Sequence, residues 1–204
     1  MRSHNHLITG TFISTVVLTT DIHLLKSSNE TVVHVGEVIK DFFIPKTLTT
    51  PVLMILYIVA GVLLIWLGTI FPDCDQHTSM VGRVIHIPVA HRTWTHAVWI
   101  PTMFLIASYW VPILRWFVLG YIEHIWCDSL SVGGICWLYP ITRYKQTGSG
   151  RYKRHLCMFY HTGEITETIV MVLICVVCGI ADYLLIFGDN SPVEYITKSL
   201  AQSI

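Results

Sequence analysis

Residues 51–71 form an apolar segment that contains no charged side chain. About twenty consecutive residues of this kind, wound into a helix, match the roughly 30 Å hydrocarbon core of a bilayer. The segment ends abruptly at Pro72-Asp73-Cys74-Asp75, where polar side chains begin. It therefore predicts a helix that crosses a membrane and ends beside two carboxylates.

The composition indicates a membrane protein. Hydrophobic residues make up 53% of the chain and charged residues only 13%, against ~25% charged residues in a typical soluble domain, and the mean hydropathy is +0.59. A chain of 204 residues is too short for several domains, so we expect one all-α, membrane-embedded domain over 1–204. The formal net charge is zero, which argues against nucleic acid as a partner.

Hydropathy predicts a polytopic helical bundle of about five segments. The segments are 7–20, 51–71, 97–110, 113–127 and 168–187. Pro112 separates the third from the fourth, and we interpret these two as a hairpin. The polar insert 21–50 is expected to hold an amphipathic surface helix or a cap on the far face, and 129–167 a loop folded over the other end. We interpret the cysteines as small apolar residues rather than ligands.

His124 and Asp128 stand four residues apart near the end of the fourth segment. On a helix this spacing separates two side chains by about 40° around the axis, so both can coordinate one cation. Gly120 precedes them by one turn and leaves room for another backbone or for a bound group. An ionisable pair at the edge of an apolar segment favours a functional site. A hydrogen-bonded pair that caps the helix is the alternative.

Asp73 and Asp75 form a second candidate pair, directly after the apolar segment 51–71. In an extended stretch, residues i and i+2 project to the same side. Two carboxylates beside a membrane would repel each other unless a cation lay near them. We therefore favour a metal role for this pair, with a solvated turn as the alternative.

The motif HRTWTH at 91–96 supplies two more histidines. If both were on one helix they would lie about 140° apart, too wide to share an ion easily. The alternative is a loop that runs up to Arg92, followed by a helix that Thr93 or Thr95 caps, so that His96 enters from the first turn. The guanidinium of Arg92 suits bidentate binding of a phosphate or carboxylate.

If the chain crosses five times, the candidate ligands emerge at one membrane face. These residues are His6, Asp73, Asp75, His91, His96, His124, Asp128 and Glu167. That face also carries eight of the thirteen lysines and arginines, namely Arg2, Arg83, Arg92, Arg143, Lys145, Arg151, Lys153 and Arg154. By the positive-inside tendency, this excess predicts that the face is cytoplasmic.

Four histidines with three or four carboxylates form a set that suits a divalent metal, with zinc preferred and manganese or iron as alternatives. The set is too large for one tetrahedral ion, so it fits two ions or one ion with a full second shell. Such a site lowers the pKa of bound water towards ~7. Hydrolysis of a phosphoester or ester fits best, with a spare carboxylate as general base and Arg92 stabilising the developing negative charge.

The order of these motifs resembles the YdjM-like family of inner-membrane metal-dependent hydrolases. The resemblance spans most of the chain and rests on the elements His6-Leu7, Pro72-Asp73-Cys74-Asp75, HRTWTH, GYIEHIWCD at 120–128, Gly133 and the stretch 137–140. A late GxxxE element of that family is similar to 163–167, which favours Glu167 over Glu164. The chain departs from the pattern at Ala97, where serine is expected, and in the insert 21–50. The order and type of ligands are also similar to those of zinc-dependent phospholipase C.

The resemblance implies a multi-pass hydrolase of the bacterial inner membrane with its site facing the cytoplasm. We predict metal ligands at His6, Asp73, Asp75, His91, His96, His124 and Asp128, and catalytic roles for Asp75, Arg92 and Glu167. The predicted substrate is a phospholipid or a lipid-linked phosphoester, and the predicted partners are membrane lipid and a second copy of the chain.

Two other functions remain open on the sequence alone. A membrane scaffold would bind a soluble regulatory partner through the basic loop 142–155 and would keep the metal as a structural element. A metal carrier would need ligands that continue through the membrane, where only Asp182 and cysteines are found.

Overall fold

The computed structural model describes residues 1–27, 29–141 and 159–187. In this part of the chain the secondary structure is helical, apart from an isolated bridge between Ser131 and Tyr160. The elements are α1 (Ser3–Leu25), α2 (Glu30–Phe43), α3 (Pro51–Ile70), η1 (Phe71–Asp75), η2 (Trp94–His96), α4 (Trp99–Ala107), α5 (Leu114–Ser129) and α6 (Ile165–Phe187). The prediction of an all-α fold is therefore confirmed for the described residues.

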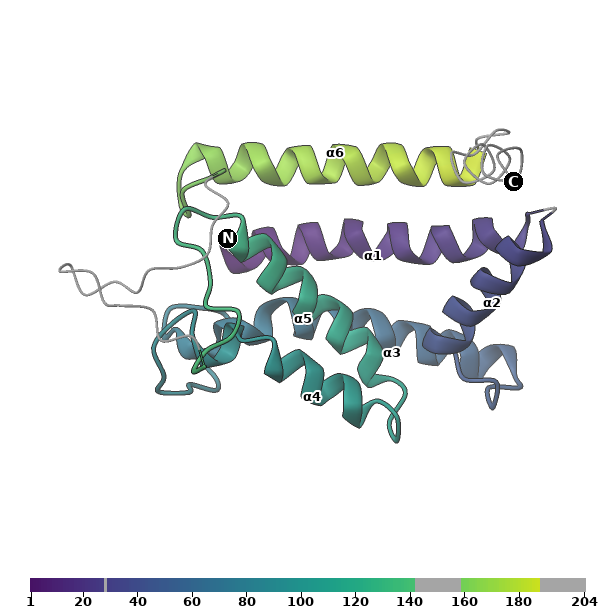
Figure 1. Cartoon of the computed structure of the whole chain (residues 1–204), viewed down its shortest axis with the longest axis horizontal. Coiled ribbons are helices and arrows are strands. Elements are labelled where there is room, and N and C mark those ends of the chain that lie inside the picture. Colours follow the sequence, from purple (N-terminus) through teal and green to yellow (C-terminus); the bar gives the residue numbers. More distant parts are fainter. Residues whose placement is uncertain (28, 142–158, 188–204) are drawn as a thin grey trace.

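Among the described residues, three helical stretches are long and apolar enough to cross a membrane: Ser3–Leu25, Pro51–Asp75 and Ile165–Leu185. They belong to α1, to α3 with η1, and to α6, and they run along the long axis of the molecule (Figure 1). The other two predicted segments form shorter helices, α4 with 9 residues and α5 with 16. At 1.5 Å per residue these reach about 14 and 24 Å, short of a ~30 Å hydrocarbon core. The number of crossings stays a prediction.

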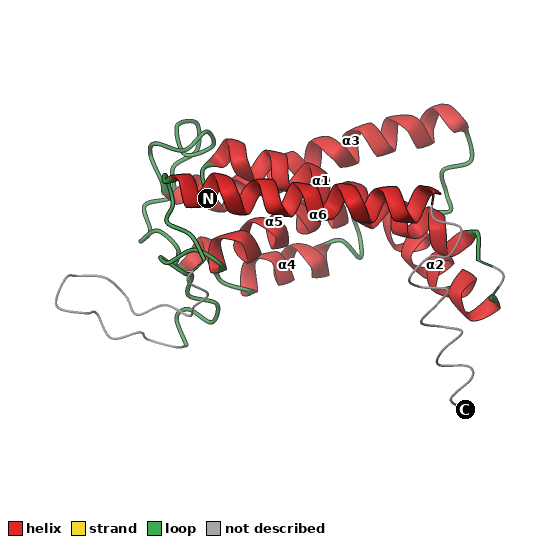
Figure 2. Cartoon of the chain, turned by 90° about the horizontal axis from the view of Figure 1, so that it is seen from above, coloured by secondary structure: helices red, strands yellow, loops and turns green. Residues whose placement is uncertain are grey.

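Helices α4 and α5 form the expected hairpin, which lies against the half of the bundle nearer the N-terminus (Figure 2). The chain turns between Ala107 and Leu114. Pro112 lies in this turn because it lacks the amide that a continuing helix requires.

Helix α1 is longer than the predicted segment 7–20 and runs from Ser3 to Leu25. Two polar side chains within it are bound by a neighbouring helix. The hydroxyls of Thr15 and Thr19 donate to the two carboxylate oxygens of Asp182 on α6, at 2.7 and 2.6 Å. The segment predicted from hydropathy was too short, because hydropathy marks only the apolar part of a helix that also includes polar residues at both ends.

Helices α3 and α5 cross at two glycines. A Cβ atom on Gly120 would collide with the carbonyl oxygen of Ile65 and would lie 3.0 Å from the amide nitrogen of Thr69. A Cβ atom on Gly68 would meet the backbone of α5 in the same way. Small residues allow two helix backbones to approach closely. The space at Gly120 was expected to hold either another backbone or a bound group. The structure shows that the backbone of α3 occupies it.

Aromatic side chains hold the short helices at this end of the bundle. Phe71, at the start of η1, lies 5.5 Å from Phe117 of α5 between ring centroids, and Phe104 of α4 lies 4.8 Å from Phe117. Tyr121 is fully buried in the same core and donates its hydroxyl to the carbonyl of Thr95. Rings from three segments thus fix η1 and η2 against the first half of α5.

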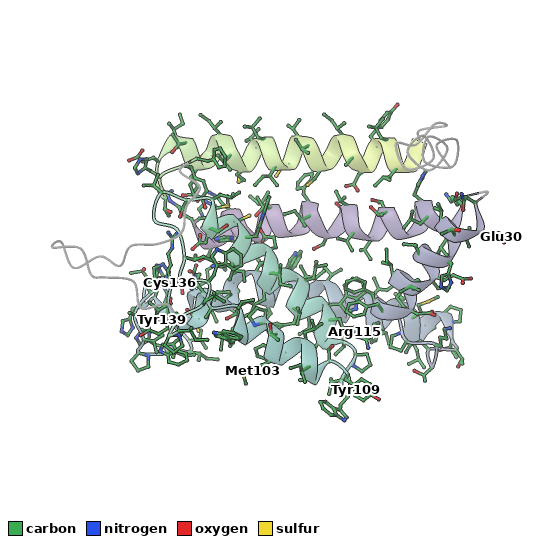
Figure 3. All side chains as sticks on the ribbon, viewed as in Figure 1. Glu30, Met103, Tyr109, Arg115, Cys136 and Tyr139 are labelled. Atoms are coloured by element: carbon green, nitrogen blue, oxygen red, sulfur yellow. The ribbon has the colours of Figure 1, made fainter. Side chains whose placement is uncertain are left out.

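The polar insert contains α2 and lies at the opposite end of the bundle. Asn29 caps α2, because its side-chain oxygen accepts from the amide of Thr31 at 2.9 Å. Arg115, near the tip of the hairpin, packs 4.6 Å from the ring centroid of Phe42. Figure 3 shows Glu30 at this end and Cys136 at the other. The expected helix is observed at this end of the bundle, and its place on the far membrane face stays a prediction.

Candidate metal centre

Four buried side chains meet where η1, η2 and α5 converge: Asp73, His96, His124 and Asp128. One ligand atom of each lies within 4.8 Å of the others. The Nε2 atoms of His124 and His96 are 3.2 Å apart. Asp128 Oδ2 lies 3.5 Å from His96 Nε2, and Asp73 Oδ1 lies 3.7 Å from His124 Nε2. Two acids and two imidazoles therefore face a common point.

These separations fit the edges of one tetrahedral site. Nitrogen and oxygen ligands stand about 2.0–2.2 Å from zinc, so two ligands of the same ion lie roughly 3.3–3.5 Å apart. The contacts of 3.2, 3.5, 3.7 and 4.0 Å lie near that value or a little above it. A small contraction around an ion would suffice to complete the coordination shell.

Hydrogen bonds fix which nitrogen of each imidazole is free. His124 donates its Nδ1 proton to the carbonyl of Thr69 at 2.6 Å. The Thr95 hydroxyl donates to Asp75 Oδ2 at 2.6 Å, so its oxygen accepts from His96 Nδ1 at 2.9 Å. Both Nε2 atoms then carry lone pairs and face each other. Burial also lowers the pKa of His96 below its ordinary value of 6.5, which keeps the ring neutral.

Two facing lone pairs in a buried site repel each other unless a cation lies between them. This pair of nitrogens, with a carboxylate on either side, is therefore a site that fits a divalent metal. The alternative in which His124 and Asp128 form a hydrogen-bonded cap is not seen, since the nearest nitrogen and oxygen atoms are 4.0 Å apart.

The local backbone differs from the expected extended stretch at Asp73 and Asp75. Residues Phe71–Asp75 form a 3₁₀ helix, in which residues two apart lie about 120° from each other around the axis. Asp73 accordingly faces His124, whereas Asp75 faces the other way, with Oδ1 2.7 Å from Nδ1 of His91. The prediction that the two acids share one side was wrong. The solvated-turn alternative is also not seen, because both acids are buried.

The motif HRTWTH also differs from its prediction. Residues up to Arg92 are a loop, as expected, but neither threonine caps a helix: Thr93 donates to the carbonyl of Ala90, and Thr95 donates to Asp75. His96 is the last residue of the short helix η2 rather than part of the first turn of a long one. The Thr95 hydroxyl instead bonds to the charged carboxylate of Asp75 and to Nδ1 of His96, so its oxygen caps no backbone amide.

Arg92 closes the other side of the cluster. It has a φ of 62°, a conformation that is uncommon outside glycine and marks functional sites when the surroundings enforce it. Its Nε lies 2.9 Å from Asp128 Oδ2, and its Nη1 donates to the hydroxyl of Ser131 at 2.8 Å. Burial alone would raise the pKa of Asp128, but the Met1 ammonium and Arg92 outweigh it and hold the pKa well below its usual range. Asp128 therefore stays ionised.

His6 lies at the edge of the four-residue cluster. Its ring stacks on that of His124 at 3.8 Å between centroids, and its Nε2 lies 3.3 Å from Asp128 Oδ1. The ring is fully buried, and among the described residues neither of its nitrogens has a hydrogen-bond partner. A buried imidazole that lies beside carboxylates without a hydrogen bond is a possible ligand for a second ion.

Glu123 was not among the predicted site residues. It is buried, accepts a hydrogen bond from Thr9 at 2.7 Å, and lies 4.0 Å from His6 Nδ1. Cys127, interpreted above as an apolar residue, lies beside it with Sγ 3.0 Å from a carboxylate oxygen. The two residues are four apart on α5, the same spacing as His124 and Asp128, so this signal was present in the sequence.

The remaining predicted residues lie in two places. Asp75, His91 and His96 form an adjoining group of possible ligands. Glu167 lies away from both groups and accepts hydrogen bonds at 2.6 Å from the Arg2 amide, the Asn5 side chain and the Gly163 amide, so it ties the start of α1 to α6. The general-base roles of Asp75 and Glu167 stay predictions.

The loop after α5 contacts the cluster in its described parts. Arg92 contacts Ser131 and, through Nη2, the hydroxyl of Thr162 at 3.4 Å. Tyr160 donates its hydroxyl to the carbonyl of Cys127 at 2.8 Å. The basic stretch 142–155 falls outside the described residues.

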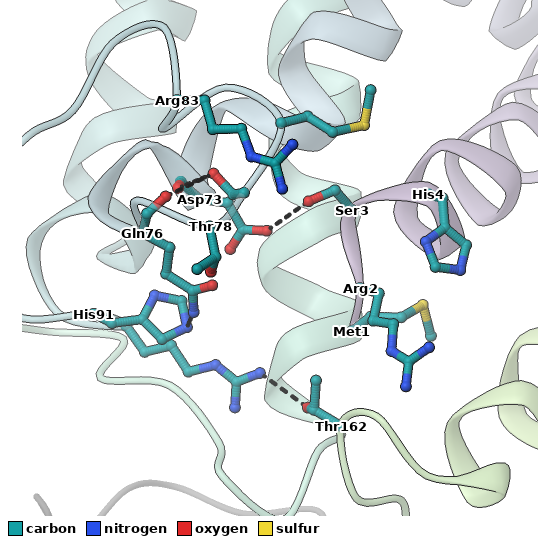
Figure 4. Close-up of a pocket in the computed structure, with 13 residues that line it drawn as sticks. Met1, Arg2, Ser3, His4, Asp73, Gln76, Thr78, Arg83, His91 and Thr162 are labelled. Carbon is teal, nitrogen blue, oxygen red and sulfur yellow. Dashed lines mark hydrogen bonds between the residues drawn. The ribbon is translucent and has the colours of Figure 1, made fainter.

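A cavity of about 330 Å³ opens beside the cluster. Asp73, His91 and Arg92 form its inner wall, and the start of α1 and the loop after η1 supply the rest. Figure 4 shows Asp73 between Arg83 on one side and Arg2 and Thr162 across the cavity. The candidate metal centre is therefore open to a small polar group.

Comparison with known proteins shows the family of the chain. Residues 1–187 match the family described as YdjM inner membrane protein, so the chain belongs to that family, as the motifs suggested. No curated protein and no solved structure matches the chain.

Proposed function

We propose that this member of the YdjM inner membrane protein family is a membrane-bound, metal-dependent hydrolase of phosphoesters or esters. The observation that carries the proposal is the pair of imidazoles whose free Nε2 atoms face each other at 3.2 Å between Asp73 and Asp128. Each imidazole is held by a hydrogen bond at Nδ1, which would be enough to fix the ring in a structural core. A structural core gains nothing from two free Nε2 atoms that face each other, whereas a metal site needs them in this position.

Asp73, His96, His124 and Asp128 would hold the ion, with zinc the best match to two nitrogens and two oxygens. A bound zinc ion would supply a nucleophilic water at neutral pH. Manganese or iron are the other candidates. Two adjoining groups offer ligands for a second ion: Asp75 and His91, which lie beside His96, and His6, which lies beside Glu123 and Cys127.

Other residues of the chain would orient the metal ligands and stabilise the charge on the substrate. The Thr69 carbonyl and the Thr95 hydroxyl hold the two imidazoles in place. Arg92, fixed by Asp128 and Ser131, would stabilise negative charge that develops on the substrate. Asp75 would accept a proton, although its three present partners, His91, Thr95 and the Arg92 amide, also suit a positioning role.

The position of the site favours a membrane substrate. The centre lies where α3 ends and α1 begins, and both belong to stretches of spanning length. A site at the ends of such helices can meet a lipid head group without extracting the lipid from the bilayer. We infer a phospholipid or lipid-linked phosphoester as substrate, at the cytoplasmic face of the inner membrane.

Elemental analysis of the purified full-length protein tests this proposal. We expect the wild type to retain zinc, and Asp128→Asn to lose it together with hydrolysis of p-nitrophenyl phosphate, by more than about 100-fold. Asp182→Asn, which changes a carboxylate on α6 that binds Thr15 and Thr19, is the matched control and should keep the metal.

A metal-free wild type, or an Asp128→Asn variant with unchanged metal content, contradicts the proposal. If metal is bound and lost as expected but no ester is hydrolysed, the metal is structural and the scaffold function takes precedence.

A further inference from the structure

The cavity beside the metal centre is lined by three arginines among mostly neutral side chains. The arginines are Arg2, Arg83 and Arg92, and the lining contains a single carboxylate, that of Asp73. Asp73 is also a candidate metal ligand, so an ion would neutralise it. What remains is a positively charged pocket whose volume of about 330 Å³ lies at the small end of ligand sites. Such a pocket suits a compact anion.

Arg83 is held beside the centre by a turn that starts from Asp73 itself. The hydroxyl of Ser79 donates to the carbonyl of Asp73 at 2.7 Å and accepts from the amide of Gly82 at 2.9 Å. A Cβ atom on Gly82 would collide with the carbonyl of Gln76, so only glycine allows the turn to close this tightly. The backbone that precedes Arg83 is therefore fixed relative to the metal ligand.

The three arginines of the cavity differ in how their charge is used. Arg92 forms an ion pair with Asp128, and the Arg2 side chain donates to the carbonyl of Gly163 at 2.7 Å. Arg83 has no carboxylate within ion-pair distance among the described residues. In the same part of the chain Arg2 also lacks a carboxylate partner, but its side chain is already bonded to the Gly163 carbonyl. The guanidinium of Arg83 is therefore the more available to an incoming anion, and its planar fork matches the oxygens of a phosphate.

Apolar side chains flank Arg83 on the exposed side of the same loop. Met80, Val84 and Ile85 are 53%, 83% and 53% exposed. Apolar side chains around an arginine are typical of a surface at the level of lipid head groups. There the apolar side chains and the aliphatic part of the arginine are buried, while the guanidinium stays in the polar layer.

From these observations we propose that the cavity is a phosphate-binding subsite, in which Arg83 binds the phosphate of the substrate while the metal centre acts on the ester bond. The inference rests on the proposed function and narrows it from esters in general to phosphate esters. The phosphate belongs either to a membrane lipid or to a water-soluble ester, and the flanking apolar residues favour the lipid.

Direct binding of inorganic phosphate to the zinc-loaded, full-length protein in detergent micelles tests the subsite. We expect Arg83→Gln to weaken the affinity measured by calorimetry by about ten- to hundredfold, because a charge-assisted pair of hydrogen bonds is lost. Arg83→Lys should weaken the affinity for phosphate less than Arg83→Gln does, since a lysine keeps the charge but lacks the planar fork of the guanidinium. Lys46→Gln removes an equal charge from an exposed lysine outside the cavity and should change nothing.

Hydrolysis separates the two sources of phosphate. If Arg83→Gln raises the KM for phosphatidic acid in mixed micelles but not for p-nitrophenyl phosphate, the subsite serves a lipid; a rise with both substrates assigns it to phosphate on any carrier. Hydrolysis of p-nitrophenyl acetate should not change.

Three results overturn the inference: a wild type that binds no phosphate, an Arg83→Gln variant that binds it as tightly as the wild type, and an equal loss of activity on the acetate. If no ester is hydrolysed at all while phosphate binding still depends on Arg83, the proposed function fails and the subsite stands.

Discussion

The hydroxyl of Thr95 links two parts of the candidate metal centre, and its removal tests the geometry most directly. It donates to Asp75 Oδ2 at 2.6 Å and accepts from His96 Nδ1 at 2.9 Å. In Thr95→Val the side chain keeps its shape and loses both hydrogen bonds. His96 is fully buried, so its Nδ1 proton would be left without an acceptor.

The size of the effect follows from these two contacts. A buried donor without a partner costs about 1–3 kcal/mol. Loss of a group that orients a metal-bound histidine typically lowers metal affinity by about 10- to 100-fold, equivalent to about 1.4–2.8 kcal/mol. Asp75 keeps its contacts with His91 and the Arg92 amide, so we expect the fold to survive and the zinc affinity to fall within this range.

Competition for zinc against a chromophoric chelator measures the affinity of the purified protein. Thr95→Ser restores a hydroxyl and should recover most of the binding. Thr102→Val is the matched control, because Thr102 donates only to the carbonyl of Val98 within α4. The reasoning is refuted if Thr95→Val binds zinc as tightly as the wild type, or if the serine variant is as weak as the valine variant.

Two further predictions concern stability. Gly120→Ala places a methyl group against the Ile65 carbonyl and should destabilise the protein by about 1–3 kcal/mol in thermal unfolding. The control is Gly179→Ala, which has nothing within 4 Å of the added methyl group and should be neutral or stabilising by up to ~1 kcal/mol. Equal melting temperatures of the two variants would contradict the close crossing of α3 and α5. The metal-free protein should lose stability as the pH falls below 6.5, because burial lowers the pKa of His96 and the unfolded chain then binds the extra proton. Melting temperatures at several pH values should show a weaker dependence in His96→Gln.

The sequence predicted which residue types meet at this end of the bundle more completely than it predicted their geometry. Spacing on a helix is a local property, so the four-residue separation of His124 and Asp128 is enough to assign them to one face. The same reasoning failed at Asp73 and Asp75, because a 3₁₀ helix and an extended strand send residues two apart in different directions. Local pattern does not distinguish these conformations over five residues.

The role of Thr95 could not be predicted either. Its acceptor, Asp75, is twenty residues away in the chain, and a threonine before a helix is usually a cap. Arg83 lay outside the predicted site for a similar reason, since its position depends on the turn that Ser79 makes back to the Asp73 carbonyl.

The sequence by itself determined the class of the protein and the residue types that converge at one end of its helices. Apolar length and the spacing of ionisable residues are properties of the chain alone, and they are sufficient for both conclusions. The tertiary structure decided which side chains touch. Contact depends on distant segments, namely the glycine crossing of α3 and α5, the aromatic packing around Phe117, and the hydrogen bonds that turn two imidazole nitrogens towards each other.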